Sequence, residues 1–290
     1  MKNYICCLIN LFLFVDFVKA QDRFEFSIST AYQQSDFKWS IAGSANGTNP
    51  NVYSELIWKN LRGPAFQTSL KTKLWKGLFI QGSVNYSAII GGSANDTDYA
   101  DDNRVNPVFE ANLQSDKGYT ADYLITVGYK YKNKKLSISP YLGYGKSTQS
   151  MFLLDENIEE LNTSYKANWS GPFVGFIFDA QLKTNLHLET DFAYHQLGYH
   201  AKADWNLIDN FAHPVSFKHT ANGFALNGKI TVVYTFYKSS AFFIDVQKSF
   251  WNTGAGIDEL FYDNGDIAFT KLNQVERNSN NLGLGLKLYF

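Results

Sequence analysis

An alternation of apolar and polar side chains with a period of two constrains this chain most, and it recurs along almost the whole sequence. It is clearest at the C-terminus, where five bulky residues share one face: Leu282, Leu284, Leu286, Leu288 and Phe290. The opposite face holds small or polar residues and one tyrosine: Gly283, Gly285, Lys287 and Tyr289. Successive side chains of a β-strand point to opposite faces, so this pattern predicts a strand.

Comparable alternation occurs in the segments 80–90, 122–131, 186–195 and 230–236. Each apolar face carries bulky residues over about ten positions, which is the length of a tilted membrane-spanning strand. The chain is 17% aromatic, with 18 Tyr and 24 Phe, as expected for a barrel with aromatic girdles at both membrane interfaces. We therefore expect an all-β fold, a transmembrane antiparallel up-and-down β-barrel, and not a secreted β-sandwich.

The predicted connections alternate in length. Short polar turns are expected at 75–77, 132–134, 183–185 and 238–240, and long polar loops at about 91–118, 148–165, 201–218 and 252–278. Counting strands between these connections gives about ten, an even number, as expected for a closed antiparallel barrel with both termini on the periplasmic side. The location predicted from this pattern is the bacterial outer membrane, with the long loops extracellular.

Residues 1–20 are predicted to be a signal peptide and residues 21–290 the barrel. Lys2 precedes an apolar stretch at 8–15, and the small residues Val18 and Ala20 suit cleavage after Ala20. Both cysteines lie within this leader, so we expect no disulfide and no thiol chemistry in the mature chain. The net charge of −1 argues against nucleic acid as a partner, and no cofactor or metal is expected.

An acidic cluster at 96–102 is the strongest candidate for chemistry. At strand spacing Asp96 and Asp98 point the same way, and two close carboxylates can hold a proton or position a water molecule. The alternatives are a solvated loop and a loose cation site with oxygen ligands.

Gly91-Gly92 followed by Asp96-x-Asp98-Tyr99 resembles the omptins, a family of ten-stranded outer-membrane proteases. The segments 55–59, 165–166 and 172–175 resemble omptin strand motifs. The resemblance implies an active site at the extracellular rim, where an Asp pair faces an Asp-x-His pair. Asp96 and Asp98 match the first pair, and Asp204 matches the second Asp.

Asn206 stands where the omptin His is expected, so the resemblance leaves His213 or His200 as the substitute base. Simple alternation from Tyr194 would also point Asp204 outward, so an active site requires a bulge before Asp204. In the omptins, acidic residues select a basic side chain of the substrate, and their positions correspond to Phe37 and Lys202 of this sequence. The lipopolysaccharide-binding arginines correspond to Thr148 and Asn168. None of these four residues keeps the family's chemistry.

His187 and His195 share a face with Glu189 and Asp191, which predicts a polar network inside a narrow barrel, with a metal site as the alternative. Two functions remain open. One is an omptin-like endopeptidase with Asp96, Asp98, Asp204 and His213 as its site and a polypeptide as substrate. The other is a non-catalytic barrel, acting as a narrow pore, an adhesin or a structural surface protein. Outer-membrane lipid, and lipopolysaccharide in particular, is the expected partner.

Overall fold

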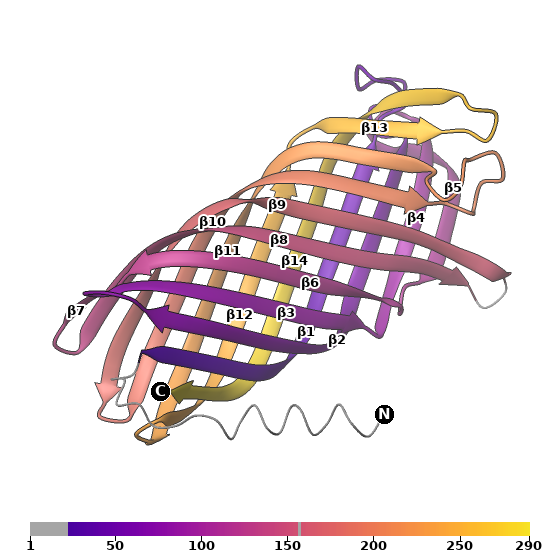
Figure 1. Ribbon diagram of the computed structural model, residues 1–290. Helices are drawn as coiled ribbons and strands as arrows, with labels where there is room; N and C mark the ends of the chain where they lie inside the picture. Colours follow the sequence, from indigo (N-terminus) through magenta and orange to yellow (C-terminus); the bar gives the residue numbers. More distant parts are fainter. Residues whose placement is uncertain (1–22, 156–157) are drawn as a thin grey trace.

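The computed structural model describes residues 23–155 and 158–290, and the predicted signal peptide lies outside them. The described chain forms one sheet that closes into a barrel (Figure 1), because the outermost segments of the strand order are joined by β1–β2 and β6–β8 pairings. A short 3₁₀ turn, η1 (Asp102–Arg104), connects two of the strands. The strand segments are β1 (Phe24–Ile41), β2 (Ser54–Lys73), β3 (Leu78–Ile89), β4 (Gly91–Asp101), β5 (Val105–Gln114), β6 (Gly118–Tyr129), β7 (Tyr131–Asn133), β8 (Leu136–Asp155), β9 (Ile158–Lys183), β10 (Leu186–Asp204), β11 (Phe217–Tyr237), β12 (Ser240–Thr253), β13 (Gly256–Phe261) and β14 (Ile267–Tyr289).

These fourteen segments trace ten strands around the barrel. Breaks of only one to three residues separate β3 from β4, β5 from β6, β6 from β7 and β12 from β13. The segments on either side of each break run in the same direction, so together they count as one strand. The pairings between the segments are antiparallel. The predicted antiparallel barrel of about ten strands is confirmed.

The two ends of the barrel differ. At one end, here called the short-turn end, neighbouring strands are joined at 74–77, 134–135, 184–185 and 238–239. Phe24 and Phe290 meet there, with the Phe24 amide donating to the Phe290 carbonyl over 2.7 Å. The opposite end, here called the long-loop end, carries β4, β5 and β13 (Figure 1). The predicted short turns are correct to within about two residues.

The predicted long loops are wrong in their extent, because most of those residues are strand. Residues 91–101 and 105–114 form the hairpin of β4 and β5, and β8 and β9 continue the wall to Asp155 and from Ile158. The loop expected at 201–218 shortens to 205–216. Beyond the lipid the outward face of a strand is polar, so the apolar alternation that marked the other strands disappears there although the strands continue.

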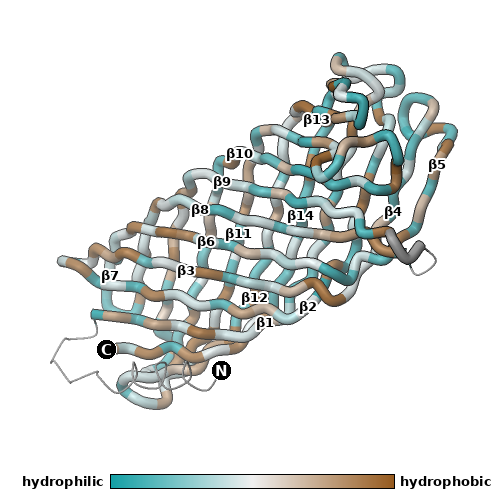
Figure 2. The backbone as a smooth tube through the Cα atoms, turned by 45° about the vertical axis from the view of Figure 1, so that its right-hand side comes forward, coloured by the Kyte–Doolittle hydropathy of each residue, from teal (hydrophilic) through white to brown (hydrophobic). Residues whose placement is uncertain are grey.

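The outer wall near the short-turn end carries a belt of exposed apolar side chains. In Figure 2 hydrophobic and hydrophilic residues alternate along the strands of this part of the barrel. Tyr144 and Tyr194 border the belt toward the long-loop end, and Tyr131 and Tyr237 border it toward the short turns. Such a belt with flanking tyrosines is the outer surface of a membrane barrel. Members of this apolar belt include Leu70, Ile80, Val84, Ile125, Val127, Leu142, Val174, Phe176, Phe192, Ile230, Ile244, Val246, Leu282 and Leu284. None of the described helices is long and apolar enough to cross a membrane.

The interior of the barrel changes from polar to apolar along the barrel axis. Inside the apolar belt the inward residues are polar and charged, and they surround a cavity of about 270 Å³. Toward the long-loop end the inward residues are large and apolar, and Trp58, Trp169, Tyr165, Tyr199 and Phe37 are among the largest fully buried side chains. The barrel therefore has a hollow polar half in the membrane and a packed aromatic half beyond it.

Candidate functional site

The polar half of the barrel, here called the lumen, is lined by charged side chains from several strands. Lys287 Nζ of β14 lies 2.6 Å from Glu189 Oε2 of β10 and 3.6 Å from Glu25 Oε1 of β1. Lys130 and His187 both contact Asp179, each over 3.1 Å. The His187–Asp179 contact joins consecutive strands, whereas the lysine contacts join segments far apart in the sequence and hold the wall of the lumen together.

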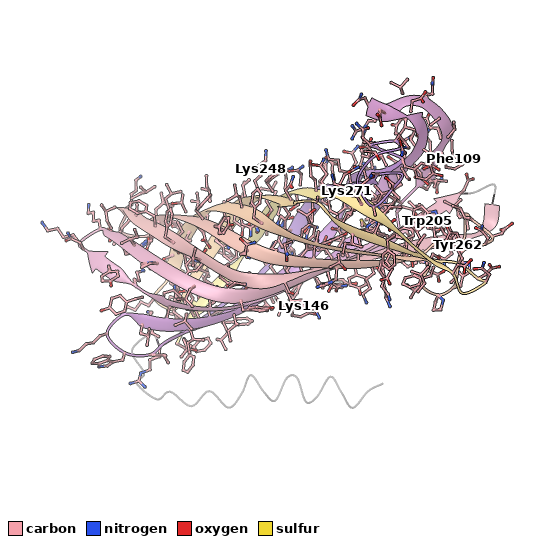
Figure 3. All side chains as sticks on the ribbon, turned by 90° about the horizontal axis from the view of Figure 1, so that it is seen from above. Phe109, Lys146, Trp205, Lys248, Tyr262 and Lys271 are labelled. Carbon is pink, nitrogen blue, oxygen red and sulfur yellow. The ribbon has the colours of Figure 1, made fainter. Side chains whose placement is uncertain are left out.

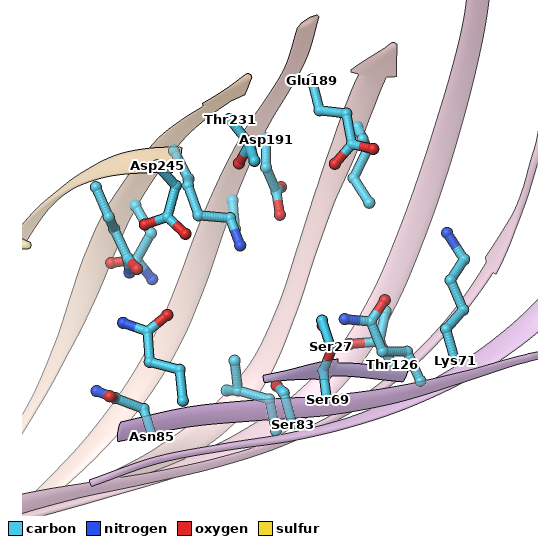
Figure 4. A pocket seen from close by; sticks show the side chains of 18 of the residues that line it. Ser27, Ser69, Lys71, Ser83, Asn85, Thr126, Glu189, Asp191, Thr231 and Asp245 are labelled. Atoms are coloured by element: carbon cyan, nitrogen blue, oxygen red, sulfur yellow. The ribbon is translucent and has the colours of Figure 1, made fainter. Parts of the chain in front are cut away.

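Asp191 and Asp245 carry further negative charge into the lumen. In Figure 4 they lie with Glu189 on one wall, and Lys71, Ser69 and Ser83 lie on the facing wall. The Tyr141 hydroxyl donates a hydrogen bond to Asp191. Asp245 Oδ1 is buried and has no hydrogen-bond partner among the described residues. The lumen therefore offers carboxylates and ammonium groups to small charged solutes.

The polar network predicted from His187 and His195 is present. His195 is buried on the inward face of β10, where Nε2 lies 2.8 Å from the Asn227 amide nitrogen of β11. Its ring packs on Phe173, with 4.6 Å between the ring centroids. Across residues 23–155 and 158–290, no group of three or more His, Cys, Asp or Glu side chains is placed to hold a metal ion.

An aromatic core closes the lumen toward the long-loop end. Trp39 of β1 packs on Tyr165 of β9 and Phe217 of β11, with centroid distances of 6.2 and 5.8 Å. Trp58 of β2 lies 5.5 Å from Tyr165, and Trp205 lies 6.3 Å from Trp39. We call Trp39, Trp58, Tyr165, Trp205 and Phe217 the aromatic core. It contains rings from β1, β2, β9 and β11 and therefore spans the interior.

A chain of buried polar groups runs through the aromatic core. The Tyr165 hydroxyl lies 2.6 Å from the Tyr199 hydroxyl and 2.7 Å from His219 Nδ1. His219 Nε2 lies 3.2 Å from Asp258 Oδ1, a close electrostatic contact that is not aligned as a hydrogen bond. The Thr270 hydroxyl donates to Asp258 Oδ2 over 2.8 Å. We call Asp258, His219, Tyr165 and Tyr199 the His219 chain.

His219 and Asp258 were not among the residues predicted from the sequence. A signal was available, because His219 alternates in phase with the apolar residues Phe217 and Ala221 and so belongs to a buried face. A histidine at such a position requires a partner. The identity of that partner depends on the pairing of β11 with β13, which places Asp258 directly opposite His219.

Asp96 and Asp98 point to the same side of β4, as predicted, but they lie in a strand. Asp96 is directly opposite Leu56 of β2 and Ala111 of β5, and it is only 5% exposed. Burial raises the pKa of Asp96 to about 7, and the neighbouring Asp98 carboxylate adds to this shift. Burial also raises the pKa of Asp98, although a hydrogen bond with Ser54 opposes the change. Asp96 is therefore a carboxyl group that can hold a proton near neutral pH.

Asp204 and His213 are also brought together, on the opposite part of the barrel rim. His213 Nδ1 lies 2.5 Å from Asp204 Oδ1, and both side chains are exposed. The pairings of β10 with β11 keep one register through to Ala203, so the bulge that would point Asp204 inward does not form. Asn206, in the expected histidine position, bonds to the Thr163 hydroxyl over 2.5 Å.

The aromatic core occupies the interior between the two predicted halves of the site. Trp58 lies two residues from Leu56, the cross-strand neighbour of Asp96, and Trp205 directly follows Asp204. Figure 3 shows Trp205 toward the long-loop end with Phe109 and Tyr262. Asp96 and Asp98 on β4 are thus separated by packed rings from Asp204 and His213.

The remaining positions implied by the resemblance are scattered. Phe37 is buried beside Trp58 and Tyr165. Lys202 and His200 are exposed on the outer wall of β10. Lys202 lies directly opposite Lys166 of β9 and Lys218 of β11, which makes a row of three lysines across adjacent strands. The hydroxyl of Thr148 donates to the side-chain oxygen of Asn168 over 2.9 Å.

Comparison with known families decides the identity of this barrel. The family model described as Pom, Protochlamydia outer membrane protein, matches residues 27–290. The chain belongs to this family. No curated protein matches the sequence.

Solved structures similar to this Pom family member are outer-membrane barrels. The outer membrane protease OmpT from Escherichia coli matches with a TM-score of 0.76 and 14% identity, over 93% of this chain and 98% of OmpT. The translocator domain of the autotransporter NalP from Neisseria meningitidis matches with a TM-score of 0.39 and 11% identity, over 100% of this chain and 95% of that domain. The OmpT match shows a shared fold, and the family places the protein in the outer membrane.

Proposed function

We propose that this Pom family member is a non-catalytic outer-membrane barrel that acts as a narrow pore, closed here by its aromatic core. The observation that carries the proposal is the change in the barrel interior, from a charged cavity of about 270 Å³ within the apolar belt to packed rings beyond it. A charged lumen suits the passage of ions and small polar solutes. An apolar constriction controls such passage by excluding water.

We place the long-loop end outside the cell in this proposal, because short turns face the periplasm and long connections face outward in barrels of this class. Trp39 is then the central ring of the closure, since it contacts Tyr165, Trp205 and Phe217. Ten strands enclose a lumen between the filled eight-stranded and the open sixteen-stranded cases. Conductance should therefore be well below that of a general porin.

Planar-bilayer recording of the refolded protein tests this function. Trp39→Ala should raise the current, because it removes a ring from the middle of the aromatic core. Trp75→Ala is the matched control, since Trp75 is 70% exposed in a short turn and should leave the current unchanged. If neither the native protein nor Trp39→Ala carries current, the barrel is not a pore.

An omptin-like endopeptidase is the second candidate, and the Asp204–His213 hydrogen bond favours it. The imidazole Nε2 would serve as the base for an attacking water molecule, with Asp204 orienting the ring. Asp96 and Asp98 would form the opposing pair, but the aromatic core has to open before a peptide lies between them. Cleavage of a peptide library, lost in both His213→Gln and Asp96→Ala/Asp98→Ala, would establish this activity.

Lipopolysaccharide is the proposed partner of the outer wall. Lys166, Lys202 and Lys218 lie directly opposite one another, and like charges in such positions repel, so a bound anion would stabilise them. Lys202, in the middle of this lysine row, lies eight residues beyond Tyr194 along β10, which is roughly 26 Å along the strand. Because Tyr194 borders the apolar belt, the lysine row lies outside the layer of lipid acyl chains. Phosphorylated sugars of the lipid are the groups that reach this height.

A further inference from the structure

We propose that the His219 chain is a proton-sensitive switch, and that protonation of His219 loosens the aromatic core that closes the barrel. The switch itself depends only on the geometry of the core. Its effect on transport rests on the proposed pore function.

The four side chains of the His219 chain come from four different strands. Tyr165 is on β9, Tyr199 on β10, His219 on β11 and Asp258 on β13, and each is at most 1% exposed. Water does not reach the chain, so its hydrogen atoms must find acceptors within the protein. A change in the number of these hydrogen atoms must therefore be absorbed by the core itself.

In the neutral form of His219 both phenol hydrogens along the row have acceptors, and the Nε2 hydrogen faces Asp258 without an aligned hydrogen bond. With the imidazole proton on Nε2, facing Asp258, Nδ1 is free to accept from the Tyr165 hydroxyl over 2.7 Å. The Tyr165 oxygen then accepts from the Tyr199 hydroxyl over 2.6 Å. Burial raises the pKa of both tyrosines, so both phenols keep their hydrogen atoms at ordinary pH.

Protonated His219 cannot accept from Tyr165, because Nδ1 then carries a hydrogen atom and becomes a donor. The Tyr165 oxygen can accept from His219, but one phenol hydrogen of Tyr165 or Tyr199 then has no acceptor among the described residues. An unsatisfied buried donor is costly. The Asp258 carboxylate attracts the new positive charge, yet it is too far along the row to accept that phenol hydrogen.

The effect reaches the closure directly, because the His219 ring is part of the packing. It lies 5.0 Å from the Trp39 ring and 5.1 Å from the Phe217 ring, measured between centroids. Relief of the unsatisfied donor requires water to enter or the rings to separate. Either change opens the region around Trp39.

The titratable groups that face His219 come from the strands packed against it. β13 contributes Asp258 and β9 contributes Tyr165, with Tyr199 of β10 one hydrogen bond further away. β1 contributes the apolar Trp39. Asp96 on β4 is also buried, but its protonation removes a buried charge and so favours the folded core. Asp96 therefore does not account for loosening in acid.

The experiment compares the refolded full-length protein at pH 7.5 and pH 5, using iodide quenching of tryptophan fluorescence together with planar-bilayer current. We expect acid to raise quenching at least twofold and the open probability at least tenfold. His219→Gln should abolish both responses. Asp258→Asn, which keeps His219 but removes the carboxylate 3.2 Å from Nε2 that attracts the protonated ring, should reduce both responses at pH 5. His200→Gln, on the exposed outer wall, should leave them unchanged.

An equal acid response in native protein and His219→Gln would overturn the switch, as would the absence of any quenching response in the native protein. If His219→Gln does not refold, an unreduced response in Asp258→Asn at pH 5 overturns it equally. A His219-dependent quenching response without current at any pH supports the switch and rejects the pore. Current that is present but independent of pH supports the pore and rejects the switch.

Discussion

Lys287 and Glu189 form a 2.6 Å ion pair inside the barrel, between β14 and β10, with Lys287 only 9% exposed. The pair lies within the apolar belt, so its charges are shielded from the surrounding lipid only by the barrel wall. Glu25 of β1, 3.6 Å away, shares the same ammonium group. One lysine therefore stabilises two carboxylates in the lumen.

Lys287→Met should destabilise the folded barrel by up to about 3 kcal/mol, because it leaves two half-buried carboxylates of the lumen without their ammonium partner. Urea unfolding of the protein refolded in detergent measures this change. Lys238→Met, at an exposed position in a short turn, is the control and should change stability by less than about 0.5 kcal/mol. Equal effects of the two substitutions would show that the Lys287–Glu189 pair contributes nothing to the free energy of unfolding.

Asp96→Asn should make the protein more stable at pH 8 than the native protein, with little difference at pH 4. The pKa of Asp96 is about 7 in the folded state and near 3.8 in the unfolded state, so the folded state binds more protons between these values. Stability therefore falls as pH rises from about 4 to about 7, by roughly 4 kcal/mol at most.

Unfolding midpoints across this pH range test the Asp96 prediction. Asp116→Asn, at an exposed position, should leave the pH profile of the native protein unchanged. If the stability of Asp96→Asn changes with pH in parallel with that of the native protein, Asp96 is not the group that makes stability fall as pH rises.

Trp58→Ala should cost about 3–5 kcal/mol of folding stability, because a fully buried ring is replaced by a cavity among Phe37 and Tyr165. Removal of the exposed Trp75 ring should cost far less. Thermal or urea unfolding of both variants gives the comparison. A small loss for Trp58→Ala would indicate that the aromatic core is loosely packed and would weaken the case for a closed pore.

Lipopolysaccharide binding should weaken when the lysine row is reversed in charge. Lys166→Glu/Lys202→Glu/Lys218→Glu is expected to lower the affinity at least tenfold, and added salt should lower the affinity of the native protein, since exposed charges are screened. Lys132→Glu/Lys134→Glu/Lys135→Glu, at the short-turn end, is the matched control. Equal losses in both triple variants would indicate a non-specific charge effect.

Much of the fold could be predicted because its signals are local. Leu282 and Leu284 are exposed on the outward face, as the period of two predicted, and the short turns lie close to their expected positions. The strand count followed from the same alternation. Outside the lipid the rule failed, because β4 exposes no large apolar side chain and the exposed apolar residues of β5, Val105, Val108 and Phe109, do not recur with a period of two.

The candidate site was only partly predictable. The shared direction of Asp96 and Asp98 follows from strand spacing within one segment, and the polar network around His195 follows from alternation along β10. The contact of His213 with Asp204 depends on how the loop after β10 returns. The outward direction of Asp204 depends on the unbroken register of β10 with its neighbours.

The sequence alone therefore determined that this chain is a membrane barrel of about ten strands, because lipid selects the residues of one face of every strand. Only the tertiary structure decided what lies inside. Register and closure place Asp258 against His219, Trp39 against Tyr165 and Lys287 against Glu189. These contacts join distant strands, and the period of each strand specifies which face its side chains occupy but not which partner they meet.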